Sequence, residues 1–240
     1  VVETQPAGYT NVSDVDATPD PDGNDGTTPN NIIPVVLTAG ENDNDNNFVE
    51  EQPGSISGTV TADTNNDNAG DTPLANVTLQ LKDAVTGAVI ATTTTNAQGQ
   101  YTFSNVAPGN YTIMETDPAG YQDVSDVDAT PDPDGNDGAT PNDMIPVTVT
   151  AGEADNNNDF VEEQLANIRG NVKADTNNDD TGDIAIGNVT IELKDAVTGA
   201  VVATTTTDAS GNYQFLNVAP GNYNVVETQP SNYLNVSDLD

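Results

Sequence analysis

The chain repeats itself every 112 residues, so its fold must be one that can be built in series. The motif Glu-Thr, followed by Gln or Asp and then Pro, begins at Glu3, Glu115 and Glu227. A period of this length is the size of a domain, whereas solenoid repeats are about 20–50 residues long. We therefore predict three domains in a row. The C-terminal part of a first repeat covers 1–53, a complete repeat covers 54–165, and the N-terminal part of a third repeat covers 166–240.

Each repeat also carries a stretch that is dense in aspartate. Residues 125–138 of the complete repeat are identical to residues 13–26 of the first repeat. Carboxylates repel one another, and this stretch has almost nothing apolar to bury, so it cannot fold by its own chemistry. A neutralising partner has to order it. Hard cations take oxygen ligands, and Ca²⁺ fits this composition best.

The net charge of the chain excludes some classes of binding partner. The net charge is −35, from four basic and 39 acidic residues, which excludes nucleic acid and argues against anionic membrane surfaces. No apolar run approaches the length of about 18 residues that membrane insertion requires. There is no Cys and no His, so disulfides, an ordinary zinc site, and thiol or imidazole catalysis are ruled out. The composition indicates an extracellular or cell-surface protein.

Paired carboxylates could in principle hydrolyse glycosidic bonds. Here they lie in segments rich in Gly, Pro and Asn, without an aromatic cleft, and the chain has no Trp. We therefore predict that the chain is not an enzyme.

Short alternating segments predict an all-β fold. Apolar and polar residues alternate between turn signals, and no helical period is visible. The two sheets are expected to take their inner faces from such pairs as Leu79 and Leu81, and Tyr101 and Phe103; Pro146 indicates an edge strand. The expected class is a tandem array of Greek-key β-sandwich domains, immunoglobulin-like or prealbumin-like. The expected strands are 55–61, 77–81, 88–95, 100–103, 111–115, 145–149 and 160–163, with 117–143 as one long loop.

The segment after the first expected strand has the ligand spacing of a calcium loop. Side chains at alternate positions, and one backbone carbonyl, can point at a single ion, as in an EF-hand-type loop. The sixth position is Asn68 or Asp180 instead of Gly, and the twelfth is Leu74 or Ile186 instead of Glu, which excludes a helix-flanked EF-hand. A Ca²⁺ loop that takes further ligands from elsewhere is expected, and a solvated turn is the alternative. The expected ligands are Asp63, Asn65, Asp67, the Ala69 carbonyl and Asp71, and in the third repeat Asp175, Asn177, Asp179, the Thr181 carbonyl and Asp183.

The aspartate-dense stretch and a shorter acidic segment are further candidate Ca²⁺ sites. The long stretch is expected to hold one or two ions, since long loops in compact domains usually have a function; a disordered acidic spacer is the alternative. The shorter segment contributes Asp155 and Asp159, with Asp43 and Asp45 in the first repeat, although Asn and Asp also suit ordinary turns. The ligands expected in the long stretch are Asp126, Asp128, Asp132, Asp134, Asn136 and Asp137, and in the first repeat Asp14, Asp16, Asp20, Asp22, Asn24 and Asp25.

Several motifs together resemble a known family. Gly58-Thr59-Val60, Asp63-Thr64-Asn65-Asn66-Asp67, Gly99-Gln100-Tyr101-Thr102-Phe103 and Pro108-Gly109-Asn110-Tyr111 resemble the SdrD B-like domain of serine-aspartate adhesins, and are similar to the wider Cna-B group. The resemblance implies Ca²⁺-binding Greek-key β-sandwiches arrayed as stalks. It also implies Ca²⁺ ligands at Asp63, Asn65, Asp67 and Asp71, and at the aspartates of the long stretch.

Some Cna-B domains carry a Lys–Asn isopeptide bond beside a Glu in a Tyr-x-x-x-Glu-Thr segment. Glu115 and Glu227 match that Glu. The Lys belongs on the first strand, where the third repeat has Lys173 but the complete repeat has Thr61, so no cross-link is predicted.

The expected function is a structural one. We expect a stalk or spacer of a bacterial cell-surface adhesin or extracellular fibre, made rigid by several Ca²⁺ per repeat. Its partners would be the neighbouring repeats and other copies in a fibre. One alternative is the subunit of a self-assembling filament held by β-strand addition. Another is a ligand-binding adhesin module, although near-identical tandem copies suit a spacer better.

Overall fold

A computed structural model describes residues 1–16, 29–44, 46–128 and 141–238 of the chain. These residues form strands, turns and irregular segments, and none of them belongs to a helix that could cross a membrane. The chain divides into two compact units. One comprises Val1–Ala62, Ala69–Asp117 and Asp123–Glu162, and the other Asp63–Asn68, Pro118–Gln122 and Glu163–Asp240. This division does not test the repeat boundaries at 53 and 165, which stay predictions.

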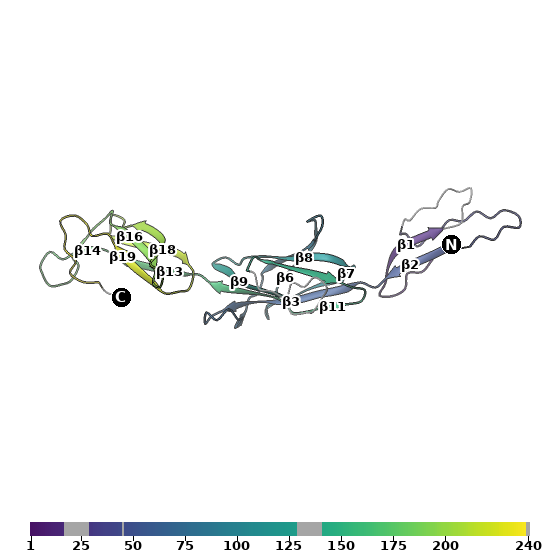
Figure 1. Cartoon of the computed structure of the whole chain (residues 1–240), viewed down its shortest axis with the longest axis horizontal. Helices are drawn as coiled ribbons and strands as arrows, with labels where there is room; N and C mark the ends of the chain where they lie inside the picture. Colours follow the sequence, from purple (N-terminus) through teal and green to yellow (C-terminus); the bar gives the residue numbers. More distant parts are fainter. Residues whose placement is uncertain (17–28, 45, 129–140, 239–240) are drawn as a thin grey trace. The chain divides into compact units, whose positions relative to one another are not determined.

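The complete repeat is built from two sheets, which confirms the all-β class (Figure 1). From Val89 to Asp155, successive strands alternate between the two sheets, as in Greek-key sandwiches. The first sheet has the order β10 (Met144–Val149), β8 (Gly109–Thr116), β5 (Thr78–Asp83) and β6 (Val89–Thr94). The second has the order β11 (Ala154–Asp155), β3 (Gly54–Asp63), β12 (Asn158–Gln164) and β9 (Tyr121–Asp128), with β4 (Thr72–Pro73) and β7 (Gln100–Val106) also paired to β3.

The core lies between these sheets, where the alternation of the sequence places it. Leu79 and Leu81 of β5 are fully buried, as is Phe160 of β12. The rings of Tyr101 and Phe103 meet edge to face, with centroids 5.9 Å apart. All the apolar pairs expected to face inward belong to this core. Pro146 lies on β10, an edge strand, as expected.

One close backbone approach fixes how β3 lies against β12. A Cβ added at Gly58 would lie 1.7 Å from the carbonyl oxygen of Asn158. The hydroxyl of Tyr101 donates a hydrogen bond to the same carbonyl at 2.7 Å. Glycine is therefore required at this position, since any side chain would push the two strands apart.

The expected long loop at 117–143 is wrong in its first part, because β9 lies within it. The segment reads Tyr-Gln-Asp-Val-Ser-Asp-Val-Asp, and aspartate is depleted in strands, so the local sequence favours a loop. Pairing with β12 overrides that local preference. The strand buries Asp126 and Asp128 on one face, where an alternating strand would place hydrophobic residues, and it buries Ser125 on the other face.

The incomplete repeats form the same kinds of element. Ile191 pairs with Thr205 in the third repeat, as Leu79 pairs with Thr93 in the complete one. A second core contains Val189, Ile191, Leu193, Phe215 and Val218. The first repeat pairs β1 (Thr10–Asp16) with β2 (Asn46–Glu51). The third pairs β13 (Ala166–Asn171) with β18 (Asn212–Val218) and β14 (Lys173–Ala174) with β15 (Ile184–Ala185), and orders β17 (Val201–Thr206), β16 (Thr190–Asp195) and β19 (Tyr223–Glu227) in one sheet.

Candidate metal centre

The loop after β3 folds around the carboxylate of Asp63, which is only 3% exposed. Its Oδ1 accepts hydrogen bonds from the backbone amides of Asn65 and Asn66, at 3.0 and 2.7 Å. Its Oδ2 accepts one from the amide of Asn68, at 2.7 Å. Burial raises the pKa of Asp63, but these backbone hydrogen bonds outweigh burial and hold the pKa below its ordinary value. The loop therefore has an ionised carboxylate at its centre.

The third repeat builds the same loop. Asp175 accepts three backbone hydrogen bonds, the shortest from Asn178 at 2.7 Å. Asn68 and Asp180, each sixth in its loop, both have a φ of 62°. EF-hand loops have glycine at this position because the turn is sharp, and Asn and Asp are the residues that best tolerate the left-handed conformation. The missing glycine therefore does not prevent a calcium-type turn.

The other expected ligands of these loops lie at exposed positions, from Asn65 to Asp71 and from Asn177 to Asp183. Asp183 accepts hydrogen bonds from the amide and hydroxyl of Thr176, at 2.9 and 2.7 Å. The acidic side chains of neither loop form a group with all carboxylates within 4.8 Å among the residues described. The Ca²⁺ ligand sets of the two loops stay predictions.

The described part of the aspartate-dense stretch is buried. Asp126 and Asp128 are almost fully buried, as is Asp14 of the first repeat, whereas the side chain of Asp16 lies outside what the structure describes. Oδ2 of Asp126 accepts a hydrogen bond from the amide of Asn142 at 2.8 Å. Asp126 and Asp128 lie on β9, and Asp14 lies on β1. The other expected ligands lie outside the described residues: Asp20, Asp22, Asn24, Asp25, Asp132, Asp134, Asn136 and Asp137, together with Asp45 of the shorter acidic segment.

The shorter acidic segment forms hydrogen bonds that connect two strands. Asp155 and Asn158 are fully buried, and Nδ2 of Asn158 donates a hydrogen bond to Oδ1 of Asp155 at 3.2 Å. Asp159 Oδ1 accepts hydrogen bonds from the amide and the hydroxyl of Thr59, both at 2.8 Å. In the first repeat, Asp43 accepts one from Asn46 at 3.1 Å. Asp159 therefore fastens β12 to β3, and a Ca²⁺ site in this segment stays a prediction.

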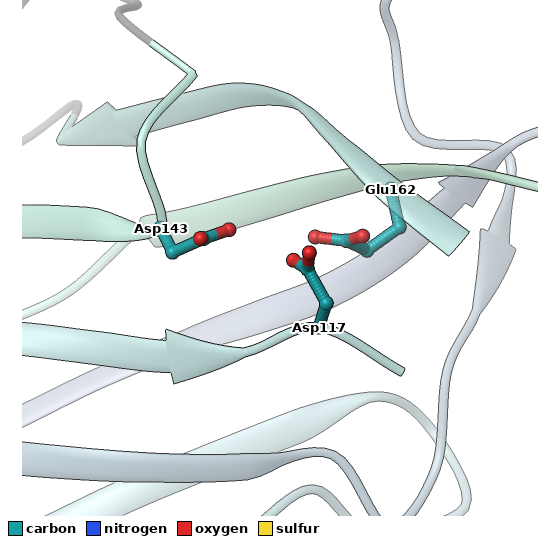
Figure 2. A group of neighbouring side chains, drawn as sticks. All are labelled: Asp117, Asp143 and Glu162. Carbon is teal, nitrogen blue, oxygen red and sulfur yellow. The ribbon is translucent and has the colours of Figure 1, made fainter. Parts of the chain in front are cut away.

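One group of three carboxylates comes together elsewhere, and we call it the acidic cluster: Asp117, Asp143 and Glu162. Each residue offers a carboxylate oxygen that lies within 4.8 Å of the others. Asp117 follows β8, Asp143 precedes β10 and Glu162 belongs to β12, and Figure 2 shows the three side chains pointing toward one another. Glu162 is 0% exposed, and neither of its carboxylate oxygens has a hydrogen-bond partner among the described residues.

The electrostatics of this cluster favour a proton or a cation. Burial, reinforced by the charge of Asp117, raises the pKa of Glu162 to about 8. Burial and the charge of Glu162 raise the pKa of the neighbouring Glu115 to about 10, and burial raises that of Asp143 to about 6. Without hydrogen-bond donors, the buried ionised forms are costly. A bound cation reverses this preference, because it favours the charged carboxylates.

The sequence-based ligand set did not include the acidic cluster. Glu162 was expected only as a strand residue, and Asp117 and Asp143 only as the ends of a loop. The signal that identifies them is a difference between repeats. Gln5 and Asn31 of the first repeat stand where Asp117 and Asp143 stand in the complete one.

Comparison with known proteins gives a consistent result. A family model described as the SdrD B-like domain matches residues 54–161 and 166–239. The chain is 34% identical over 183 residues to serine-aspartate repeat-containing protein E of Staphylococcus aureus strain MSSA476, which covers 72% of this chain and 15% of that protein. Protein F of the same name, from Staphylococcus epidermidis, is 36% identical over 164 residues, or 65% of this chain and 10% of that protein. The structure of the Bacillus anthracis TIE protein is similar with a TM-score of 0.38 and 18% identity, covering 79% of this chain and 34% of that one.

Proposed function

The chain belongs to the SdrD B-like domain family, and on that basis we propose that it is a Ca²⁺-rigidified stalk or spacer of a bacterial cell-surface adhesin or extracellular fibre. The family consists of structural surface domains, so the role is mechanical and not enzymatic. The chain spans only 15% of the length of its S. aureus relative. The surface location of the whole protein and its partners, which are the neighbouring repeats and other copies in a fibre, are therefore part of this proposal.

The observation that carries the proposal is the shortage of protein cations around buried carboxylates. The chain has four basic residues for 39 acidic ones. One of the four, Lys194, is already paired with Glu192 at 2.9 Å. In the complete repeat, Asp63, Asp126 and Glu162 are nevertheless buried. The neutralising charge has to come from solution, and oxygen ligands of this kind suit Ca²⁺.

Ca²⁺ would act by stabilising the folded repeats and fixing their acidic segments. An ion that binds only the folded state adds about 2.7 kcal/mol when it is present at about a hundred times its dissociation constant. Extracellular calcium modules have dissociation constants of about 10⁻⁴ to 10⁻³ M. Several ions bound in each repeat would contribute more free energy to its stability than a modest core does. They would also hold the mutually repelling acidic segments in fixed positions.

The test compares the chain in excess Ca²⁺ with the chain in EGTA. We expect a higher melting temperature in Ca²⁺ by calorimetry, several bound ions by titration, and a more extended, stiffer particle by small-angle scattering. Mg²⁺ at the same ionic strength is the control, because it screens charge without matching the ligand geometry. Equal melting temperatures and scattering in Ca²⁺ and EGTA would contradict the proposal.

Open sheet edges favour a second candidate, a filament held by β-strand addition. In the complete repeat, β6 is an edge strand, and its Val89 and Ile90 are 51% and 56% exposed. In the third repeat, β17 occupies the same position, with Val201 and Val202 equally exposed. An edge of this kind can pair with another chain. Sedimentation at increasing concentration tests it: assembly that Val89→Lys weakens supports the filament, and a monomer at every concentration excludes it.

A further inference from the structure

The complete repeat has an acid at four positions where the first repeat has an amide, and an amide, Asn157, where the first repeat has Asp45. These exchanges stand out because long segments around them are identical or nearly so. One of the four acids, Asp159 in place of Asn47, accepts hydrogen bonds from Thr59, and the other three lie in or beside the acidic cluster. The three exchanged pairs at the cluster are Gln5 and Asp117, Asn11 and Asp123, and Asn31 and Asp143.

The backbone around these positions is the same in both repeats. The amide of Glu115 donates a hydrogen bond to the carbonyl of Asp143 at 2.9 Å, and the amide of Glu3 donates one to the carbonyl of Asn31 at 3.0 Å. Asp143 and Asn31 have left-handed φ angles of 61° and 60°. The exchange is therefore a change of side-chain chemistry on an unchanged backbone.

In the first repeat, the amides supply hydrogen-bond donors to buried or half-buried carboxylates. Nε2 of Gln5 donates to the carboxylate of Glu50. Nδ2 of Asn11 donates to Oδ1 of Asp14 at 2.7 Å. One oxygen of each carboxylate thus has a donor from its own chain, although Oε1 of Glu50 is buried without a partner among the described residues.

The third repeat has an amide, Asn235, at the position of Asn11, as the first repeat does. Nδ2 of Asn235 donates to the carboxylate of Asp238 at 3.1 Å. Gln229 occupies the position of Gln5. The acidic version is therefore a feature of the complete repeat among the positions that this chain contains.

In the complete repeat, the same acceptors have lost their donors. Glu162, equivalent to Glu50, is 0% exposed, and neither oxygen accepts a hydrogen bond within the described residues. Oδ1 of Asp126, equivalent to the Oδ1 of Asp14 that accepts the Asn11 amide, is likewise buried and unsatisfied there. An ionised carboxylate can only accept hydrogen bonds, so Asp117 and Asp123 cannot replace the amides. A proton or a cation has to supply the missing positive charge in their place.

We propose that a Ca²⁺ ion binds between Asp117, Asp143 and Glu162 in the complete repeat, where it replaces the amide donors of the first repeat. Ligands on opposite sides of Ca²⁺ are about 5 Å apart, since each lies about 2.3–2.6 Å from the ion. The three carboxylate oxygens, within 4.8 Å of one another, fit around one such ion. Asp117 is exposed, so water can complete the six to eight ligands that Ca²⁺ takes.

This inference deepens the proposed function and rests on its premise that the repeats bind Ca²⁺. The test transplants the first repeat's side chains into the full chain as Asp117→Gln, Asp123→Asn and Asp143→Asn. Calorimetric titration at pH 7.4 should count one Ca²⁺ fewer per chain than in the parent. In EGTA, the variant should melt at a higher temperature than the parent, because its amides donate where the acids repel.

Two further variants keep the test decisive. Asp117→Gln alone changes an exposed side chain, so it tests the site even if the triple variant folds poorly, and it should weaken one Ca²⁺ at least tenfold. The reverse exchange, Gln5→Asp with Asn11→Asp and Asn31→Asp, should add one Ca²⁺. Unchanged stoichiometry and affinity in all three variants would overturn the inference.

The outcomes separate this site from the proposed function. If the parent binds several Ca²⁺ and the variants bind the same number, the site inference fails and the stalk proposal stands. If the parent binds one Ca²⁺ that the triple variant lacks, the site inference holds and the several-ion strut mechanism fails. If the parent binds none, both fail.

Discussion

Replacing Asp63 tests whether the loop after β3 is held by its own hydrogen bonds or only by an ion. The buried carboxylate accepts three backbone amides at 2.7–3.0 Å. Hydrogen bonds to a charged group contribute about 1.5–3 kcal/mol each to stability. Here the donor amides belong to exposed residues, so water can bind them once the carboxylate is removed, and a loss of about 1 kcal/mol for each bond is expected. Asp63→Ala should therefore cost about 3 kcal/mol. Asp63→Asn keeps Oδ1 and two of the bonds, so it should cost about 1 kcal/mol.

The assay is calorimetry of the full chain in EGTA, which removes any contribution of Ca²⁺. For a domain of about 100 residues, 1 kcal/mol shifts the melting temperature by about 4–8 °C, so Asp63→Ala should lower one transition by at least about 10 °C. Asp175→Ala is the matched control and should shift the third repeat's transition by a similar amount. Because hydrogen bonds lower the pKa of Asp63, its contribution is present above pH 3.8 and is lost as the pH falls below that value. A shift below about 0.5 kcal/mol in EGTA would refute the reasoning, since water would then replace the carboxylate without loss.

Three further predictions concern the complete repeat. In EGTA, Glu162 should contribute a fall of up to about 5 kcal/mol in the free energy of unfolding as the pH rises from 4.5 to about 8, since burial raises its pKa to about 8 and the folded chain keeps a proton that the unfolded chain releases. Glu162→Gln should make the urea-denaturation profile shallower without abolishing its slope, because burial also raises the pKa of Glu115 to about 10, and an unchanged slope in this variant would contradict the assignment. Phe160→Ala removes a fully buried ring and should cost about 3–5 kcal/mol by urea denaturation. Gly58→Ala should cost about 3 kcal/mol, because its Cβ would meet the Asn158 carbonyl at 1.7 Å, whereas Gly87→Ala, with nothing within 4 Å, should cost only about 1 kcal/mol of backbone strain.

The strands that the sequence predicts correctly are those whose alternation has an apolar inner face. Residue type alone predicts burial for two such pairs, Leu79 with Leu81 and Tyr101 with Phe103. Both pairs lie in the core. The strand β9 gives no such signal, because the buried side of its chain carries Asp126 and Asp128. Local propensity favours a loop there, and only pairing with β12, which is distant in the sequence, makes it a strand.

The acidic cluster could not be predicted from spacing for a related reason. Its members come from the end of β8, the start of β10 and the middle of β12, and no short motif joins them. The loop at Asp63 was visible because its candidate ligands lie within nine consecutive residues. The cluster becomes visible in the sequence only when the repeats are set side by side and the three amides are found exchanged for acids.

That exchange gives a physical reason for near-identical repeats to differ. A repeat with Gln5 and Asn11 gives a carboxylate oxygen of Glu50 and one of Asp14 an amide donor from its own chain. A repeat with Asp117 and Asp123 gives up those donors, and on the proposal above its stability at the same place would rise with the logarithm of the Ca²⁺ concentration above the dissociation constant. In an array of such domains, the choice of amide or acid at these three positions would then set whether a repeat has this additional Ca²⁺ site. The backbone can therefore stay constant along a stalk while its response to Ca²⁺ varies from one repeat to the next.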